Sequence, residues 1–220
     1  MVGALSRAPT NAVKQEKRTK ANEGASGFRG AFCCGRGNKD NMQTVLECLR
    51  SYKQMKKDYT FTLKSGVQFT LRFTYDQFYH IIGLQHLRGD TKMHVKGKPK
   101  ASVLKAIERG EITQEQLEAD PNYSDVYERV LYFDYFERFF SKDICSRAYM
   151  FNPDLVPGYT LVKGKYLLCQ KMALPAGAGY LYLFLGLDED DRAAYICTFF
   201  PGTGNRFVRD QKWDDIEEIR

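Results

Sequence analysis

The sequence has few of the residues that bind metal ions or build disulfide frameworks. Its 220 residues include three histidines and six cysteines, with no Cys-x-x-Cys pair and no His-Glu-x-x-His motif. The spacing typical of zinc sites is therefore missing, and we expect no metal and no cofactor. The cysteines are scattered through a chain long enough to build a core, which favours reduced thiols over disulfides.

Long hydrophobic runs are also missing. No apolar stretch approaches the roughly 18 to 20 residues that span a bilayer, and the opening MVGALSRAPTNAVKQEKRTK holds no sustained apolar segment. We therefore expect a soluble, non-secreted protein that does not contact a membrane and resides in the cytoplasm.

Acidic residues are scarce in the first hundred positions. Residues 1–58 carry 12 Lys or Arg against 5 Asp or Glu, and residues 59–100 carry 7 against 2. Residues 101–220 reverse the balance, with 14 basic and 20 acidic side chains. A polyanion would therefore bind near the first hundred residues, although lysine-rich tails and loops can equally serve solubility.

The composition divides the chain into a tail and one domain. Residues 1–40 are rich in Ala, Gly, Asn, Lys and Arg and show no periodicity, which is typical of a disordered, basic tail. From Met42 to Tyr52 apolar residues recur at helical spacing, which predicts the first helix of a domain over residues 41–220.

The segment from Tyr59 to Phe73 gives the clearest strand pattern. Apolar and polar residues alternate on both sides of Ser65-Gly66, which predicts a β-hairpin with one polar face. The next stretch, FTYDQFYHIIGLQHLRGD, predicts a short amphipathic helix, with Thr74 and Gln77 at the spacing of a capping box. A basic loop, TKMHVKGKPK, follows it.

The remaining chain predicts a helical insert and then further strands. Residues 98–142 contain SVLKAIERG and PNYSDVYERVLYFDYFERFF, which we interpret as two helices, the second capped by Asp120 and covering a sheet. After Tyr159 strand patterns return in LVKGKYLLCQKM, YLYLFLG, RAAYICTFF and RFVRD. The fold class is therefore α+β, with an antiparallel sheet of four or more strands and helices on one face.

Two of the three histidines, His80 and His86, lie on the predicted amphipathic helix. At about 100° per residue, side chains six positions apart point about 120° away from each other, so the two imidazoles do not share a ligand. His80 lies at the border of the apolar stripe, where a hydrogen-bonded structural histidine is the ordinary alternative. We take His80 as the catalytic candidate and His86 as an unlikely one.

The surroundings of His80 fit the needs of a ribonuclease that works without metal. Arg72 lies on the preceding strand, and Lys96 belongs to a loop with several other cations. A base that removes the 2′-hydroxyl proton, an acid for the leaving oxygen and cations for the phosphorane-like transition state would suffice. Arg72 and Lys96 are the phosphate-binding candidates, and each can equally be a solvated charge.

At this point the sequence resembles a known family. The order FTLKSGVQFTLRF, FYHIIGLQHL, YERVLYFDYF and YLYLFLGLDEDDRAAYICTFF is similar to the fourth phage-associated group of nuclease-like proteins named for barnase, EndoU, colicin-type tRNases and RelE (the BECR fold). The resemblance covers roughly residues 42–220. It implies a curved four-stranded antiparallel sheet with RNA phosphate across its open face, in domains of large polyvalent proteins and small effectors of phages and conjugative elements.

The resemblance also implies site residues. The histidine of its FYHxxGL motif falls on His80, while Thr198 and Gln211 match recurring polar positions and become candidate phosphate or base contacts. Thr198 can equally be an ordinary strand residue, and Gln211 a surface amide. The acidic runs at 188–191 and 214–218 would repel phosphate if they faced the cleft.

Two functions remain open. The first is a metal-independent endoribonuclease, a toxin-like effector of a phage or mobile element that cleaves RNA or tRNA by 2′-hydroxyl transphosphorylation. The second is a catalytically inactive accessory module that binds RNA or protein, since only one well-placed histidine is present. RNA is the expected partner in the first, and an inhibitor or host protein is a further candidate. Aromatic residues of YFDYFERFF could stack on bases, but at helical spacing they are core residues more often.

Overall fold

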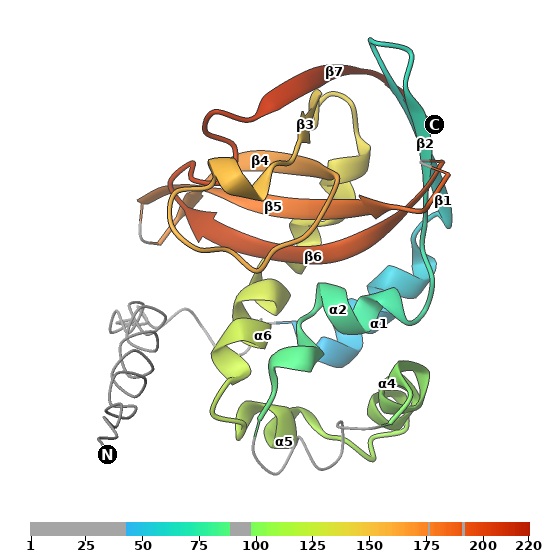
Figure 1. Ribbon diagram of the computed structural model, residues 1–220. Helices are drawn as coiled ribbons and strands as arrows, with labels where there is room; N and C mark the ends of the chain where they lie inside the picture. Colours follow the sequence, from blue (N-terminus) through green and yellow to red (C-terminus); the bar gives the residue numbers. More distant parts are fainter. Residues whose placement is uncertain (1–42, 89–97, 176, 191) are drawn as a thin grey trace, which may run out of the picture. The chain divides into compact units, whose positions relative to one another are not determined.

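Seven strands in the described part of the chain form a sheet that closes on itself. The computed structural model describes residues 43–88, 98–175, 177–190 and 192–220 (Figure 1). The helices are α1 (Val45–Gln54), α2 (Gln77–Ile81), α4 (Lys100–Glu108), α5 (Gln114–Glu118) and α6 (Tyr123–Leu131), with 3-10 turns η2 (Leu84–His86), η3 (Phe133–Tyr135), η4 (Glu137–Phe140) and η5 (Pro153–Leu155). The strands are β1 (Asp58–Leu63), β2 (Gln68–Arg72), β3 (Arg147–Met150), β4 (Tyr166–Leu174), β5 (Gly177–Leu187), β6 (Ala193–Thr203) and β7 (Lys212–Ile219).

The strand order is β1-β2-β6-β5-β4-β3-β7, and β7 pairs again with β1. The α+β class is confirmed, but the expectation of a purely antiparallel sheet is wrong. β2 and β6 run parallel through two residue pairs, Thr70 with Ala193 and Leu71 with Ala194. Parallel neighbours require a long crossover connection, and the helical section plus β3 to β5 between these two strands supplies it.

The first helix and the hairpin form as predicted. Thr44 and Glu47 make a capping box at the start of α1, in which each side chain binds the other residue's backbone N–H; such caps contribute about 0.5–2 kcal/mol. β1 pairs antiparallel with β2 from Asp58–Arg72 to Thr62–Gln68. Gly66 adopts φ +88° in the turn, a left-handed conformation that glycine adopts without steric cost.

The predicted amphipathic helix is shorter than its sequence pattern indicates. α2 begins only at Gln77, and neither Thr74 nor Asp76 caps it with a side chain, so the predicted capping box is wrong. The helix ends at Ile81, and Gly83 at φ +83° turns the chain into η2. Because no continuous helix joins His80 to His86, the 120° argument for their separation does not apply.

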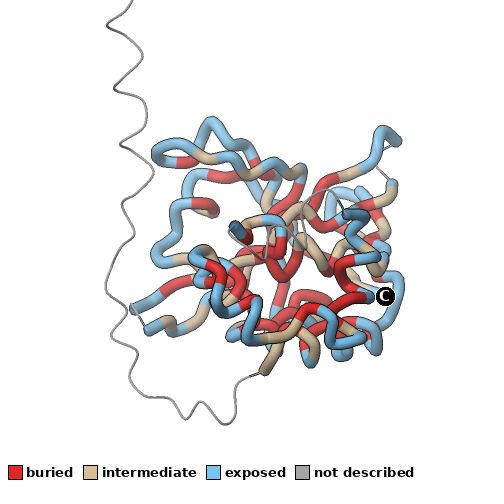
Figure 2. Tube along the Cα trace, turned by 90° about the horizontal axis from the view of Figure 1, so that it is seen from below, coloured by how far each residue is buried: buried red, intermediate tan, exposed pale blue. Residues whose placement is uncertain are grey.

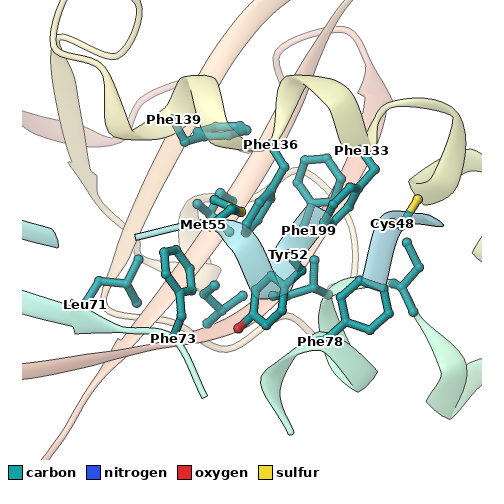
Figure 3. Close-up of a cluster of buried hydrophobic side chains, with 14 of the residues drawn as sticks. Cys48, Tyr52, Met55, Leu71, Phe73, Phe78, Phe133, Phe136, Phe139 and Phe199 are labelled. Atoms are coloured by element: carbon teal, nitrogen blue, oxygen red, sulfur yellow. The ribbon is translucent and has the colours of Figure 1, made fainter. Parts of the chain in front are cut away.

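The aromatic segment of the insert forms core, although not as one helix. α6 ends at Leu131, and two 3-10 turns carry the chain from Phe133 to Phe140. α6 begins after Asn122, so Asp120 is not its N-cap residue. Figure 3 shows aromatic rings from α1, the hairpin, this segment and β6 gathered in one cluster, in which Phe136 packs edge-on against Phe199 at 5.3 Å between ring centroids.

Three of the four predicted carboxy-terminal strands form, as β4, β5 and β6. The segment RFVRD at 206–210 forms turns instead of a strand, and the last strand is β7. β3 and α5 had no clear signal, because both are short. Among the described residues, no helix is both long and apolar enough to cross a membrane.

Neither face of the β4–β6 region is open. On one face the strands contribute to the main core beneath the helices, and Figure 2 shows buried residues (red) concentrated in the interior of the domain. On the other face Leu167, Tyr182 and Phe184 are fully buried beneath Phe151, Val156 and Phe207. The expectation of an open sheet face for RNA is therefore wrong over these strands, because apolar segments before β4 and after β6 cover it.

Candidate active site

The segment between β2 and α2 is fixed by hydrogen bonds to the first helix and its exit. The Phe73 N–H donates to the Lys57 carbonyl at 2.8 Å. The Tyr52 hydroxyl donates to the Thr74 carbonyl at 2.9 Å. These bonds determine where α2 starts, and they place His80 on its last turn, which lies alongside β6 (Figure 1).

Arg129 of α6 joins the end of α2 to β6. Its Nε donates to the Phe199 carbonyl at 2.7 Å, and its Nη1 donates to the Asp125 carbonyl at 2.6 Å. A Cβ at Gly83 would lie 2.8 Å from Nη1 of Arg129. Only glycine fits this approach, so the buried guanidinium holds the α2–η2 corner against the sheet.

β6 has an unpaired stretch of edge beside α2. Its pairing with β2 stops at Ala194, while its pairing with β5 continues to Thr203. The β5–β6 register shifts between Phe184 and Leu185, which leaves Cys197 as the extra residue of a bulge. Bulges redirect the side chains beside them and often occur near active sites.

A cavity of about 340 Å³ lies between this edge of β6, α2 and the start of α4. Eight residues line it: Thr74, Asp76, Gln77, His80, Lys100, Tyr195, Ile196 and Cys197. Its volume is near the lower end of the roughly 300–1,000 Å³ typical of small-ligand pockets. It can therefore receive a small ligand, with a histidine and a lysine in its walls.

His80 is half-buried in this cavity. Burial lowers the pKa of His80 from its ordinary value, and the positive charges of Lys100 and His86 lower it further. A neutral imidazole can accept a proton, so these neighbours keep His80 in the form that a general base requires near neutral pH. No hydrogen bond to its ring is found among the described residues.

Lys100 is not one of the phosphate-binding candidates that the sequence predicts, although it belongs to the basic loop. It is the first residue of α4 and faces the same cavity as His80. Lys96, which was the candidate from this loop, lies outside the described residues. The sequence showed a run of lysines but not which of them the start of a helix would direct to the site.

His86 is outside the cavity lining but close enough to influence it. Its ring Nε2 lies 3.1 Å from the Gln85 side-chain nitrogen. Burial and the nearby Arg129 lower the pKa of His86, so it too favours the neutral form.

The raised pKa of Cys197 disfavours this thiol as a nucleophile. Burial raises the pKa of Cys197 to about 11, with its sulfur near the Gly186 backbone N–H. A thiol with so high a pKa is almost entirely protonated at neutral pH.

The Tyr195 ring lies over Gly186, where an added Cβ would be 2.5 Å from the tyrosine hydroxyl oxygen. That hydroxyl therefore lies over β5.

Thr198 and Arg72 lie outside the cavity lining. Thr198 is opposite Phe184 in the β5–β6 ladder. Directly opposed residues share a sheet face, so Thr198 is on the face covered by the second apolar cluster, which contains Phe184. Arg72 is exposed and 3.6 Å from the Asp58 carboxylate, close to Thr74 along the chain but not in the cavity wall.

Gln211 is buried and occupied by a structural contact. Its Oε1 accepts from the Asn152 N–H at 2.8 Å, and its Nε2 donates to the Asn152 carbonyl at 2.9 Å. The amide thus replaces a strand partner for the segment that covers the outer sheet face. The alternative interpretation as a surface amide is wrong, since Gln211 is only 3% exposed.

We expect Gln211→Ala to lower the free energy of unfolding by about 1–3 kcal/mol, because it removes both partners of the Asn152 backbone. Urea unfolding measures this loss, and Gln68→Ala, at an exposed amide on β2, should change stability by no more than about 0.5 kcal/mol. Activity per folded molecule should not change. A fall in activity at unchanged stability would restore Gln211 as a site residue.

The described residues of the acidic runs do not line the cavity. β7, with the whole 214–218 run, pairs with β1 and β3 and lies on the other side of the strands from α2 (Figure 1). The Asp188 carboxylate accepts from the backbone N–H groups of Arg192 and Ala193. Asp76 is the one acidic residue in the cavity wall among the described residues, so the walls do not repel phosphate strongly.

One comparison with known proteins gives a match. A family model described as phage-Barnase-EndoU-ColicinE5/D-RelE like nuclease4 matches residues 44–219. No curated protein and no solved structure matches the chain.

Proposed function

Because the chain belongs to the phage-Barnase-EndoU-ColicinE5/D-RelE like nuclease4 family, we propose that it is an endoribonuclease that cleaves single-stranded RNA without a metal ion. The observation that carries this proposal is the shared cavity of His80 and Lys100. A neutral imidazole and an ammonium in one nucleotide-sized cavity are the groups that RNA transphosphorylation needs. The role would be that of a cytoplasmic effector of a phage or mobile element.

The reaction uses the ribose as its own nucleophile. His80 takes the proton of the 2′-hydroxyl, the 2′-oxygen forms a bond to phosphorus, and the bond from phosphorus to the 5′-oxygen breaks. Lys100 stabilises the charge that develops on the non-bridging oxygens. Water protonates the departing 5′-oxygen, so the products are a 2′,3′-cyclic phosphate and a 5′-hydroxyl.

The geometry also explains why single-stranded RNA is the proposed substrate. The cavity of about 340 Å³ is bounded by α2, α4 and β6, which leaves space for one nucleotide separated from its neighbours but not for a duplex. DNA lacks the 2′-hydroxyl and would not be cleaved by this route.

We expect the purified protein to cleave single-stranded RNA in EDTA and to leave DNA of the same sequence intact. Mass spectrometry of the products should show 2′,3′-cyclic phosphate ends. Cleavage that requires an added divalent ion, or products with 5′-phosphates, would contradict the mechanism. Binding of RNA without cleavage would instead favour the accessory binding module, because His80 would then not act as a general base.

A further inference from the structure

A group of exposed cations lies near the cavity. These cations come from the region where α1, α4 and the β1–β2 hairpin meet. We call Lys53, Lys56, Lys57 and Arg72 the basic track; all four are exposed. They come from the end of α1, the turn after it and the end of β2. Residues from different elements thus give one surface a positive charge.

Backbone contacts make the basic track continuous with the cavity. Lys57 accepts the hydrogen bond from Phe73, which lies between Arg72 of the track and Thr74 of the cavity wall. The Lys57 Nζ donates to the Lys53 carbonyl at 3.0 Å. The track therefore begins within two residues of the cavity wall.

A carboxylate links the track to the other side of the cavity. Glu108 of α4 lies 2.6 Å from the Lys53 ammonium, and it accepts from the Tyr75 hydroxyl at 2.8 Å. Tyr75 follows Thr74 directly. This network connects α1, α4 and the segment before α2, so Lys100 and the track belong to one packed unit.

The track keeps a positive charge after its internal ion pairs are counted. Arg72 faces Asp58 at 3.6 Å and Lys53 faces Glu108 at 2.6 Å, but no carboxylate pairs with Lys56 or Lys57 among the described residues. The Arg72–Asp58 pair is solvent-exposed, and exposed pairs contribute only about 0–1 kcal/mol, whereas Glu108 of the other pair is partly buried. A phosphate can therefore compete for these cations at low cost.

The surface of α6, which lies outside the cavity lining, is less suited to a polyanion. α6 carries Asp125 and Glu128 near His86 and Arg129. These carboxyl groups offset the nearby cations, so the basic track is the more favourable surface for an RNA chain.

We propose that the basic track binds the phosphates of single-stranded RNA that flank the nucleotide held in the cavity. This inference rests on the proposed function and extends it, since it makes the protein an enzyme for RNA chains in preference to dinucleotides. Each phosphate contact releases counterions, so binding should weaken with salt in proportion to the number of contacts.

The test measures binding separately from cleavage. His80→Ala protein is titrated into a fluorescent single-stranded RNA of 12 nucleotides, and the anisotropy gives Kd between 50 and 200 mM salt. Adding Lys56→Ala, Lys57→Ala and Arg72→Ala should raise Kd and make the slope of log K against log salt shallower by about 2, at about 0.7 for each lost contact. A control with Lys163→Ala, Lys171→Ala and Lys212→Ala, all exposed and outside the track, should keep the parent slope.

Cleavage by protein with an intact His80 provides the second measurement. The three track substitutions should raise KM for the 12-nucleotide RNA and leave kcat/KM for a dinucleotide unchanged. An unchanged salt slope, or an equal loss of kcat/KM for both substrates, would overturn the proposal that the track binds RNA, even if the protein proves to be a ribonuclease. No cleavage by any variant, with a slope that still depends on the track, would overturn the proposed function and leave the track as an RNA-binding surface.

Discussion

His80→Ala should lower the rate of RNA cleavage by about 10²- to 10⁴-fold, which is the contribution typical of a general base. Burial and neighbouring positive charges lower the pKa of the cavity imidazole, so its loss removes the neutral base that we propose accepts the 2′-hydroxyl proton. Single-turnover cleavage of a short RNA in EDTA measures the change. Thermal unfolding of the same preparation should show an intact fold, because the half-buried ring has no hydrogen-bond partner among the described residues.

The pH dependence distinguishes catalysis by His80 from a structural role. The folded-state pKa of His80 lies below its ordinary value, so the active, neutral form is lost only as the pH falls through that lowered pKa, below about 6.5. Lys100→Gln removes a positive charge from beside the ring. The acid limb of the rate profile should therefore move to higher pH in this variant, while the maximal rate falls because the transition state loses a cation.

His86→Asn serves as the matched control. His86 lies outside the cavity lining, but its charge also lowers the pKa of His80, so this variant should remain active and move the acid limb slightly upward. If His80→Ala were folded and cleaved RNA at the rate of the unsubstituted protein, the base would have to be another group. The same pH limb in Lys100→Gln as in the parent would show that the lysine and the histidine do not interact.

The local sequence pattern was sufficient to predict secondary structure where the signal lies within the segment itself. The hairpin over 59–73 has alternating residues and a glycine turn, and the first helix has apolar residues at helical spacing, so both formed as predicted. The prediction of one continuous helix containing His80 and His86 was wrong, because Gly83 adopts a left-handed turn that periodicity does not reveal. The parallel β2–β6 pair also could not be predicted, since it depends on contacts between segments more than 120 positions apart.

The candidate site shows the same limit. His80 became a candidate because it lies at the edge of an apolar stripe, but the basic loop did not show that Lys100, and not Lys96, would be the lysine in the cavity wall. Gln211 could not be assigned, because its burial depends on Asn152, which lies 59 positions away. The role of Arg129 could not be predicted for a similar reason. An arginine on a helix is ordinarily solvent-exposed, and Arg129 is buried only because Gly83 and Phe199 pack around it.

Arg129→Met should lower the free energy of unfolding by about 2–4 kcal/mol. The substitution keeps an unbranched side chain of similar length but removes both donors, and the carbonyl of the fully buried Phe199 loses its partner. An unsatisfied buried acceptor costs about 1–3 kcal/mol, and the lost contacts with Gly83 and Asp125 add to it. Urea unfolding with an unchanged m-value would establish that the loss is one of stability.

Arg129→Lys separates charge from geometry in this effect. Lysine keeps the positive charge, but a single ammonium cannot reproduce the fork that reaches Phe199 and Asp125 together, so we expect it to recover less than half of the loss. Arg138→Met, at an exposed arginine that stacks on Tyr135, should cost no more than about 1 kcal/mol. Full stability of Arg129→Met would show that the Phe199 carbonyl finds another donor. Because this arginine holds the α2–η2 corner against β6, its loss should also reduce RNA cleavage while the chemistry of His80 is unaltered, which would appear as a lower rate at an unchanged acid limb.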